Sequence, residues 1–595
     1  MEQLIHNGIY VRKYEWKGLC IKVEGKRIKL NPKQEEMAIA WVKKLETEYV
    51  KDKVFVKNFF EDFCRALNLE KKLGPEKFDF SEVIQYVREE KRRLESLSKE
   101  EKKRLREERK ALREALKEKF GYAIVDGVKM EVSNYVAEPS CIFMGRGKHP
   151  KRGRWKEGPE ERDIELNLSP DAPRPPGNWK RILWKPNVMW IARWRDKLTG
   201  KMKYVWLSEN SRLKQMRDIE KFEKALELGR NIEKIKQHIM ENLDSEDLIR
   251  RKTATVCYLI DRLKIRVGDE KDPEEADTVG ASTLRPEHIK FLEDGTVVFN
   301  FLGKDSVPHV FKVKLPDKVV RNLKEFISTA NSPIFEGVNS KRVSEFLDEV
   351  MEGLSAKVFR TYYASKAVED TLKSIPVKKS DPIYYKKYVA SIANLEAAKV
   401  CNHRRKIPKN WREIIRKREE KLREYLQRSR ERVKKLEDRI RKRREYYVEK
   451  IKIYEAKILE LKKKEAEIRK IIEEKERRGK PVKALKKRLL GVVKARRKRE
   501  EMTRRLKRKF REDLGKLRKR LSETKQKERE RIRKARLQID IRKKTRNYNL
   551  NTSLKSYIDP RIYYRWGMEV DFDWKLYYPK SLQKKFSWVE NPILC

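Results

Sequence analysis

The sequence lacks any long apolar run. Nowhere in its 595 residues does an apolar stretch approach the roughly 20 residues that a membrane-spanning helix requires. The opening residues, MEQLIHNGIY, also lack the basic start and apolar core of a signal peptide. Together these absences predict a protein that has no membrane partner.

Cysteine and histidine are scarce, at six residues each. The cysteines lie far apart without a C-x-x-C pair and the histidines do not cluster, which argues against a zinc module and favours reduced intracellular thiols. The sequence also lacks a carboxylate cluster and a phosphate-binding loop of the G-x-x-x-x-G-K-[ST] type. We therefore expect no metal, no ATP and no other cofactor.

Positive charge is what the sequence has in abundance. Lysine and arginine number 151 against 94 aspartates and glutamates, a net charge of +57. Self-repulsion on this scale weakens a compact fold, so the charge is better explained by a polyanionic partner. With membranes set aside, that partner is nucleic acid.

Composition divides the chain into five predicted segments, in keeping with a length that suggests roughly three to five folding units. Residues 1–140 form a mixed lobe, 141–213 a strand-rich part with the basic glycine-rich loop FMGRGKHP, and 214–410 a mainly helical core. Residues 411–545 are a basic helical stretch and 546–595 a small globular tail.

Local patterns predict particular elements within these segments. Residues 86–120 have the composition of one highly charged helix, and AIVDGVKMEV predicts two strands around an Asp126-Gly127 turn. Further strands are predicted for IELNL, RILWK, VMWIARW and YVWLS, and a strand pair for VVFNF and HVFKVKL, joined by LGKDSVP.

The basic stretch 411–545 carries 57 lysines and arginines against 24 acidic residues, a net charge of +33. An apolar column recurs every seven residues, as in a coiled coil: Leu426, Val433, Ile440, Tyr447, Tyr454, Leu461 and Ile468. It breaks at Gly479-Lys480-Pro481, after which a second basic helical stretch of similar length follows. This pattern predicts an antiparallel hairpin with arms of roughly 100 Å.

DNA strand transfer needs a nucleophile, fixed cations around the phosphate and a proton for the leaving sugar oxygen. Tyrosine, with a pKa of about 10, is both a fair nucleophile and a good leaving group, so a tyrosyl phosphodiester can be resealed without ATP. Each candidate alone would more often be a phosphate contact or a packing residue, and only their joint order is informative. The candidates are Arg266 in RLKIRVGDE, Lys304 in FLGKDS, Arg360 in AKVFRTYYAS, His403 in KVCNHRR and Tyr557 in SLKSYIDPR.

These motifs resemble the eukaryotic-type DNA topoisomerase IB family over nearly the whole chain. The matching stretches are FMGRGKHP, KYVWLS, IRVGDEKDPEEADTVGASTLRPEHI, FLGKDS, EGLSAKVFRTY, CNHRR and YIDPRI. The resemblance implies a monomeric enzyme that relaxes supercoiled double-stranded DNA through a 3′-phosphotyrosyl intermediate, strand rotation and religation. It also implies an α+β fold: a multidomain DNA clamp with a long antiparallel coiled-coil linker and a small helical C-terminal domain that carries the nucleophile.

The resemblance also implies a role for each candidate. Tyr557 is expected to be the nucleophile and Lys304 the general acid that protonates the leaving 5′-oxygen. Arg266, Arg360 and His403 are expected to bind the oxygens of the scissile phosphate. Residues 1–140 would then be the clamp cap and 214–410 the catalytic core.

Four further residues are expected at the DNA. Arg146 would enter the minor groove beside the break, with Lys148 in the same motif and Asp305 near the same place. Ser556 stands where the family commonly has asparagine, which puts sensitivity to camptothecin-type poisons in doubt. The start close to the clamp and the Lys/Arg/Glu-rich composition suggest an archaeal source and a nucleoid-associated cytoplasmic location, with the nucleus as the alternative.

Two other functions fit part of the sequence. A tyrosine recombinase-like strand transferase would use the same Arg–Lys–Arg–His–Tyr chemistry, but would not ordinarily place a basic heptad hairpin between His403 and Tyr557. A non-enzymatic nucleic-acid-binding coiled-coil protein would account for 411–545 and the charge, but not for the ordered motifs.

Overall fold

The computed structural model describes residues 1–145, 147–269, 277–329 and 333–590, with the backbone alone at Asp305. Over these residues the chain forms two compact units. The first comprises Met1–Lys379, Ala393–Arg405 and the residues from Tyr548 onward, and the second comprises Ser380–Ile392 and Lys406–Asn547. The C-terminal segment therefore belongs to the same unit as the first part of the chain, although the second unit intervenes in sequence.

The N-terminal part of the first unit combines small sheets with helices. Its strands pair in the orders β1-β5-β6, β3-β2-β4 and β7-β8. The strands are β1 Leu4–His6, β2 Cys20–Val23, β3 Lys26–Lys29, β4 Phe78–Asp79, β5 Tyr122–Val125, β6 Val128–Glu131, β7 Cys141–Ile142 and β8 Trp155–Lys156. The helices are α1 Pro32–Val42, α2 Lys53–Ala66, α3 Ser81–Ser96 and α4 Lys99–Phe120. The predicted turn at Asp126-Gly127 is confirmed: both residues have positive φ and join β5 to β6.

The prediction of one helix over residues 86–120 is wrong, because α3 ends at Ser96 and α4 begins at Lys99. Ser98 caps the second helix. Its hydroxyl accepts a hydrogen bond from the Glu101 N–H at 3.1 Å, and the Glu101 carboxylate accepts one from the Ser98 N–H at 2.8 Å. This capping box satisfies two N-terminal donors of α4 and so starts a new helix inside a uniformly charged stretch.

The strand-rich part forms a four-stranded sheet in the order β10-β9-β11-β12. Its strands are β9 Ile164–Asn167, β10 Arg181–Leu183, β11 Trp190–Arg195 and β12 Met202–Trp206. All four predicted strands are thus confirmed. Their buried residues pack with β1, β5 and β6 in a single apolar core.

The next part of the first unit is helical with one three-stranded sheet, β13-β14-β15. Its elements are α5 Arg212–Glu241, α6 Leu248–Leu263, β13 Ile289–Phe291, β14 Thr296–Gly303, β15 Val307–Lys314, α7 Asp317–Thr329, α8 Ser340–Asp348, α9 Ala356–Ser374 and α10 Ile383–Val400. The predicted strand pair is therefore confirmed as β14 and β15. Helix α10 contributes residues to both units.

The C-terminal segment adds helices α13 Leu550–Ser556, α14 Pro560–Val570 and α15 Lys580–Lys585 to the first unit. Gln215 on α5 donates hydrogen bonds to the carbonyls of Lys584 and Lys585, at 3.0 and 3.1 Å. The Lys585 ammonium in turn contacts Glu209 at 2.6 Å and Asp218 at 3.0 Å. These contacts attach the C-terminal helices directly to the core helix α5.

Short 3-10 turns complete the described elements: η1 Glu48–Lys51, η2 Pro75–Lys77, η3 Glu161–Asp163, η4 Asn242–Asp244, η5 Pro286–His288, η6 Lys304–Ser306, η7 Trp574–Leu576 and η8 Ser587–Glu590. Across the described ranges, no helix is long and apolar enough to cross a membrane.

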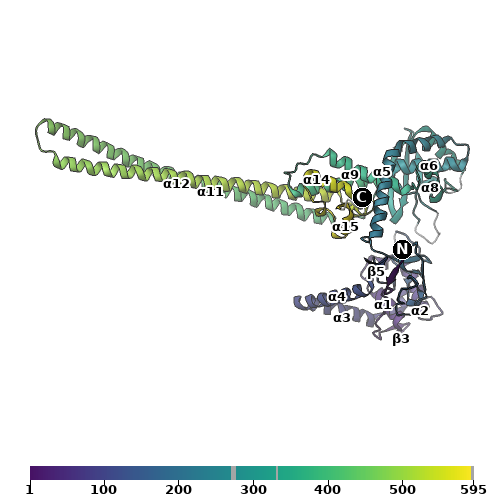
Figure 1. Cartoon of the computed structure of the whole chain (residues 1–595). Helices are drawn as coiled ribbons and strands as arrows, with labels where there is room; N and C mark the ends of the chain where they lie inside the picture. Colours follow the sequence, from purple (N-terminus) through teal and green to yellow (C-terminus); the bar gives the residue numbers. More distant parts are fainter. Residues whose placement is uncertain (146, 270–276, 330–332, 591–595) are drawn as a thin grey trace. The chain divides into compact units, whose positions relative to one another are not determined.

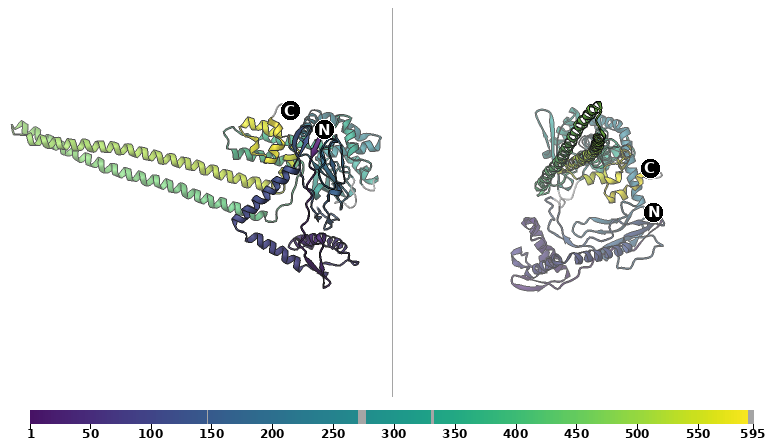
Figure 2. Two further views of the ribbon diagram at one scale, coloured as in Figure 1. Left: turned by 60° about the horizontal axis from the view of Figure 1, so that its bottom comes forward. Right: turned by 90° about the vertical axis from the view of Figure 1, so that its left-hand side faces the viewer.

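The second unit consists mainly of two long helices, α11 Trp411–Arg477 and α12 Lys483–Lys544, which lie side by side (Figures 1 and 2). Ion pairs between them join Glu419 to Lys543, Arg443 to Asp513 and Glu465 to Arg496. As the residue numbers of the partners increase along α11, those of their partners on α12 decrease. The two helices are therefore antiparallel. All seven members of the predicted heptad column are buried or half-buried, and the predicted break lies between the two helices.

Candidate functional site

Tyr557 occupies the C-cap position of helix α13, and its side chain is only 4% exposed. Its N–H donates to the carbonyl of Ser553 at 2.9 Å. On α9, the Ser365 hydroxyl donates to the Tyr557 carbonyl at 3.2 Å and accepts from the Asp559 N–H at 3.0 Å. Asp559 then caps α14, with Pro560 at its first position. The motif YIDPRI is thus a sharp junction between two helices that holds the tyrosine in place.

Arg360 lies on α9 and is almost fully buried, at 3% exposure. Its Nη2 donates to the carbonyl of Cys401 at 2.6 Å, and its guanidinium carbon lies 5.1 Å from the centre of the Tyr557 ring. Its buried Nε has no hydrogen-bond partner among the described residues. A buried cation with an unsatisfied donor costs free energy unless an anion joins it. An anion beside the tyrosine ring would therefore be stabilised by this arginine.

His403 follows α10 and contacts both of these groups. Its ring centre lies 5.1 Å from that of Tyr557, its Nδ1 lies 2.7 Å from the Ser553 hydroxyl, and its Nε2 lies 3.4 Å from Nη2 of Arg360. Burial, together with the positive charges of Arg360 and Arg266, lowers the pKa of His403 to about 3. The imidazole is therefore neutral near pH 7.

Arg266 lies in the loop that follows α6 and has an exposed side chain. Its carbonyl accepts a hydrogen bond from the Ala281 N–H at 2.8 Å, and the next pair, Ser282 to Val267, continues this pairing. The positive charge of Arg266 contributes to the lowered pKa of His403, after burial and the charge of Arg360. The structure thus brings together three predicted residues, Arg360, His403 and Tyr557, and places Arg266 in the loop that follows α6.

Lys304 begins the turn η6 between β14 and β15, and its side chain is exposed. The two strands pair up to Gly303 opposite Val307, so the lysine projects from the tip of a regular hairpin. The Asn402 side chain donates to the carbonyl of Pro308 at 3.3 Å, which joins this hairpin to the residue preceding His403. The hairpin tip therefore lies in the neighbourhood of the cluster.

The four predicted DNA contacts are placed only in part. Arg146 and the side chain of Asp305 lie outside the described residues. Lys148 is exposed in a turn, and Ser556 is half-buried as the last residue of α13. Their proximity to DNA stays a prediction.

Three residues at the site were missed in the sequence. Ser553 and Ser365 contact His403 and the Tyr557 backbone, and no local motif distinguishes such serines from others. His309 lies on β15, where burial and the charges of Arg360, Arg404 and Arg266 lower its pKa to about 4. One signal could have found it: period-two alternation places His309 on the same side of its strand as Phe311, which is otherwise an apolar side.

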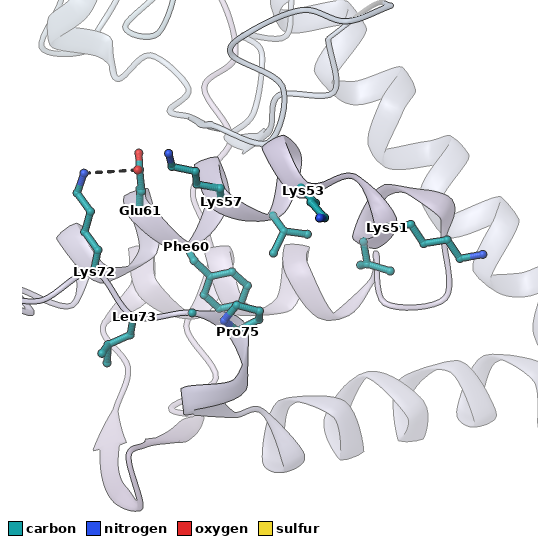
Figure 3. Close-up of a pocket in the computed structure, with 11 residues that line it drawn as sticks. Lys51, Lys53, Lys57, Phe60, Glu61, Lys72, Leu73 and Pro75 are labelled. Atoms are coloured by element: carbon teal, nitrogen blue, oxygen red, sulfur yellow. Dashed lines mark hydrogen bonds and ion pairs between the residues drawn. The ribbon is translucent and has the colours of Figure 1, made fainter.

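A separate pocket of about 460 Å³ lies within residues 50–75 (Figure 3). Lys51, Lys53, Lys57 and Lys72 surround an apolar floor that includes Phe60, and Lys72 pairs with Glu61 at 3.4 Å. None of the predicted catalytic residues lines this pocket. In the part of the chain that the structure describes, no group of three or more histidine, cysteine or acidic side chains is placed to hold a metal ion.

Comparison with known families accounts for most of the chain. Residues 1–207 match the family model for the eukaryotic DNA topoisomerase I DNA-binding fragment, and residues 210–440 match that for its catalytic core. Residues 529–593 match a C-terminal topoisomerase domain. Tyr557 lies within this last match, whereas Arg266, Arg360 and His403 lie within the catalytic-core match.

Individual relatives agree with these matches. DNA topoisomerase 1 of Candidozyma auris is 36% identical over 437 residues, covering 71% of this chain and 57% of the relative. DNA topoisomerase 1 of Homo sapiens is 35% identical over 403 residues, covering 65% of this chain and 52% of the relative. DNA topoisomerase 1 beta of Arabidopsis thaliana is 35% identical over 419 residues, covering 68% of this chain and 45% of the relative. The chain thus spans about half the length of the curated relatives that it matches.

Proposed function

The chain belongs to the eukaryotic DNA topoisomerase I family, and on that premise we propose that it relaxes supercoiled duplex DNA by transient cleavage of one strand. One observation carries the proposal. The buried Tyr557 ring is flanked by Arg360, whose Nε lacks a partner among the described residues, and by a neutral His403. A phosphodiester placed beside the tyrosine would supply the anion that Arg360 lacks.

The chemistry follows from these positions. The Tyr557 oxygen attacks the scissile phosphorus and its phenol proton passes to water, while a 3′-phosphotyrosyl bond forms and the bond to the 5′-oxygen breaks. Lys304, at the hairpin tip, gives its proton to the departing 5′-oxygen. Arg266, Arg360 and His403 hold the non-bridging oxygens, where charge develops in the transition state. One phosphoester replaces another, so religation is the reverse reaction and needs no ATP.

Neutral His403 has a defined part in this scheme. A bound phosphate offsets the charges of Arg360 and Arg266 that lower its pKa. The imidazole can then donate from Nε2 to a phosphate oxygen while Ser553 fixes its Nδ1 side. Ser553 acts as a positioning residue, because its hydroxyl orients the imidazole ring and does not contact the reacting atoms.

The segments of the chain take separate roles in this proposal. Residues 1–140 form a clamp cap, 141–213 a strand-rich core with a DNA-contacting loop, and 214–410 the catalytic core. Residues 411–545 form a coiled-coil linker and 546–595 the domain that carries the nucleophile. Arg146, Lys148, Asp305 and Ser556 contact DNA near the break.

Double-stranded DNA is the proposed partner, and the enzyme acts as a monomer. The relatives described above are eukaryotic proteins, which favours the nucleus as the location. Cation–phosphate contacts from a chain of net charge +57 make binding fall steeply as salt rises.

Relaxation of negatively supercoiled plasmid by the purified chain, in EDTA and without ATP, tests the proposal. We expect a ladder of topoisomers, and a covalent protein–DNA adduct when the reaction is stopped with denaturant. Recombined products restricted to one DNA sequence would instead support a strand transferase. Binding without any adduct would identify a non-enzymatic DNA-binding protein.

A further inference from the structure

A second cavity, of about 560 Å³, lies among α5, α6, α9 and the end of β15. Four cationic side chains line it: Lys236, Arg262, Lys264 and Lys314. Asp261 is the acidic residue that the described lining contributes, and the rest of the lining is apolar or aromatic. The cavity therefore suits a small anion that also has an apolar part.

Lys264 occupies an unusual position in this cavity. It is the C-cap of α6 in the left-handed conformation, with φ at +56°, where a residue with a Cβ is strained. Its side chain is 21% exposed, and its Nζ lies 3.3 Å from the centre of the Tyr363 ring. A left-handed residue is a common way to end a helix, but a largely buried ammonium at that position is costly.

The charge of this ammonium is poorly compensated. Nζ contacts the Asp261 carbonyl but lies 3.8 Å from the Asp261 carboxylate, which also accepts a 2.5 Å hydrogen bond from the Tyr363 hydroxyl. Burial, and then the nearby charges of Arg262 and Lys236, lower the pKa of Lys264 to about 8, against the opposing effect of Asp261. About a tenth of this amine is therefore unprotonated and nucleophilic at pH 7, far more than for an ordinary lysine.

The pKa of Lys236, in the same cavity, is shifted in the opposite direction. Its Nζ donates to Glu233 at 2.9 Å, and this bond raises its pKa. It therefore stays protonated and serves as a cation rather than a nucleophile. The cavity thus combines a reactive amine with a cation that can hold an anionic leaving group.

Two residues of the cavity lining are close in sequence to arginines of the candidate site. Lys264 precedes Arg266 by two residues in the segment that follows α6. Tyr363 follows Arg360 by one turn on α9. A change at Lys264 that disturbs its contact with Tyr363 would therefore act on the loop that positions Arg266.

We propose that Lys264 is a covalent modification site that takes an acyl group from small acyl phosphates, and that its acylation slows DNA cleavage. The unprotonated Nζ attacks the carbonyl carbon, an amide bond forms and the bond to the phosphate oxygen breaks. The phosphate leaves as an anion beside Lys236, Arg262 and Lys314, and the proton lost by Nζ passes to solvent. The acylated side chain is neutral and larger, so it loses its place over Tyr363 and displaces the Arg266 loop.

Mass spectrometry of the full-length protein treated with acetyl phosphate at pH 8 tests the modification. We expect acetyl occupancy at Lys264 to exceed that at Lys236 by roughly tenfold or more, because more of the Lys264 amine is unprotonated and the cavity cations hold the acyl phosphate beside it. An acetyl N-hydroxysuccinimide ester, which is uncharged, is the matched donor and should show a smaller preference. Equal occupancy at the two lysines, or equal preference with both donors, would overturn the proposal.

The effect on cleavage rests on the proposed function and is measured separately. Acetylated wild-type protein should cleave DNA about tenfold more slowly, as expected when a positioning loop moves. The variant Lys264→Arg keeps the charge and should be insensitive to acetyl phosphate. Lys264→Gly suits the backbone conformation and controls for folding. Slowing of the Lys264→Arg variant by acetyl phosphate would exclude Lys264 as the regulatory site, whereas an inactive untreated wild type would reject only the proposed function.

Discussion

The ring of His403 lies beside that of Tyr557, with centroids 5.1 Å apart, although 154 residues separate them in sequence. Ser553, one turn before the tyrosine on α13, lies 2.7 Å from Nδ1 of the histidine. The Asn549 N–H, at the start of the same helix, donates to the His403 carbonyl at 2.7 Å. Helix α13 therefore orients the histidine and the tyrosine together.

Ser553→Ala tests this coupling. Loss of the hydroxyl frees the imidazole to rotate, so we expect single-turnover cleavage to slow by about tenfold while DNA affinity stays nearly constant. Thr552→Ala, one residue earlier on the same helix, is the matched control. Unchanged cleavage in Ser553→Ala would show that the histidine is oriented by other contacts.

The protonation of His403 gives a second prediction. Because burial and two arginines lower its pKa to about 3, NMR should show a neutral ring at pH 6 in the DNA-free protein. Binding of an uncleavable duplex should raise this pKa, since the phosphate offsets Arg360 and Arg266. A charged ring in the free protein at pH 6 would contradict the assignment.

The same shift predicts how stability depends on pH. Between the unfolded value near 6.5 and the folded value of about 3, the unfolded chain binds a proton at His403 that the folded chain does not. The free energy of unfolding should therefore fall as pH is lowered through this window. Denaturant titrations should find a smaller fall in His403→Gln, with the remainder arising from other buried histidines such as His309.

The role of Lys304 as the general acid can be tested by changing the leaving group of the DNA substrate. Lys304→Ala should slow cleavage of ordinary DNA by about 10²–10⁴-fold if the lysine is the general acid. A substrate with sulfur at the 5′-bridging position should recover much of this loss, because a thiolate leaves without a proton. Equal slowing on both substrates would reassign Lys304 to phosphate binding.

The coiled-coil hairpin is predicted to be dispensable for chemistry. The C-terminal helices contact the core through Gln215, Lys585 and Asn549 without using α11 or α12. Fragments 1–410 and 541–595, when mixed, should therefore recover part of the relaxation activity. They should also bind DNA with a shallower salt dependence, because a segment of net charge +33 is missing. Inert fragments that fold and associate would show that the hairpin positions Tyr557.

The regular elements were the most predictable part of the molecule. The heptad column and the Gly479-Lys480-Pro481 break predicted the two long helices because period and breaker residues act locally. The interruption between α3 and α4 was missed because charge dominates that stretch, whereas a single capping box at Ser98 decides it. The strands could be predicted from the alternation of apolar and polar residues, but the order in which they pair in the sheets could not.

The candidate site was only partly predictable. Ordered motifs indicated Arg266, Arg360, His403 and Tyr557, and the structure brings the last three of these together. Their catalytic roles, and that of Lys304, stay predictions. Ser553 and Ser365 could not be predicted, because their importance depends on contacts between segments more than 100 residues apart rather than on any local pattern.

The most direct test of the central claim is the identity of the residue that carries the broken strand. Wild-type protein should be trapped on a duplex that loses its 5′ fragment after cleavage, and peptide mapping should locate the 3′-phosphate on Tyr557. Tyr557→Phe removes one hydroxyl and keeps the buried ring, so it should bind the duplex with nearly unchanged affinity and form no adduct. An adduct on another residue, or persistent cleavage by Tyr557→Phe, would contradict the account.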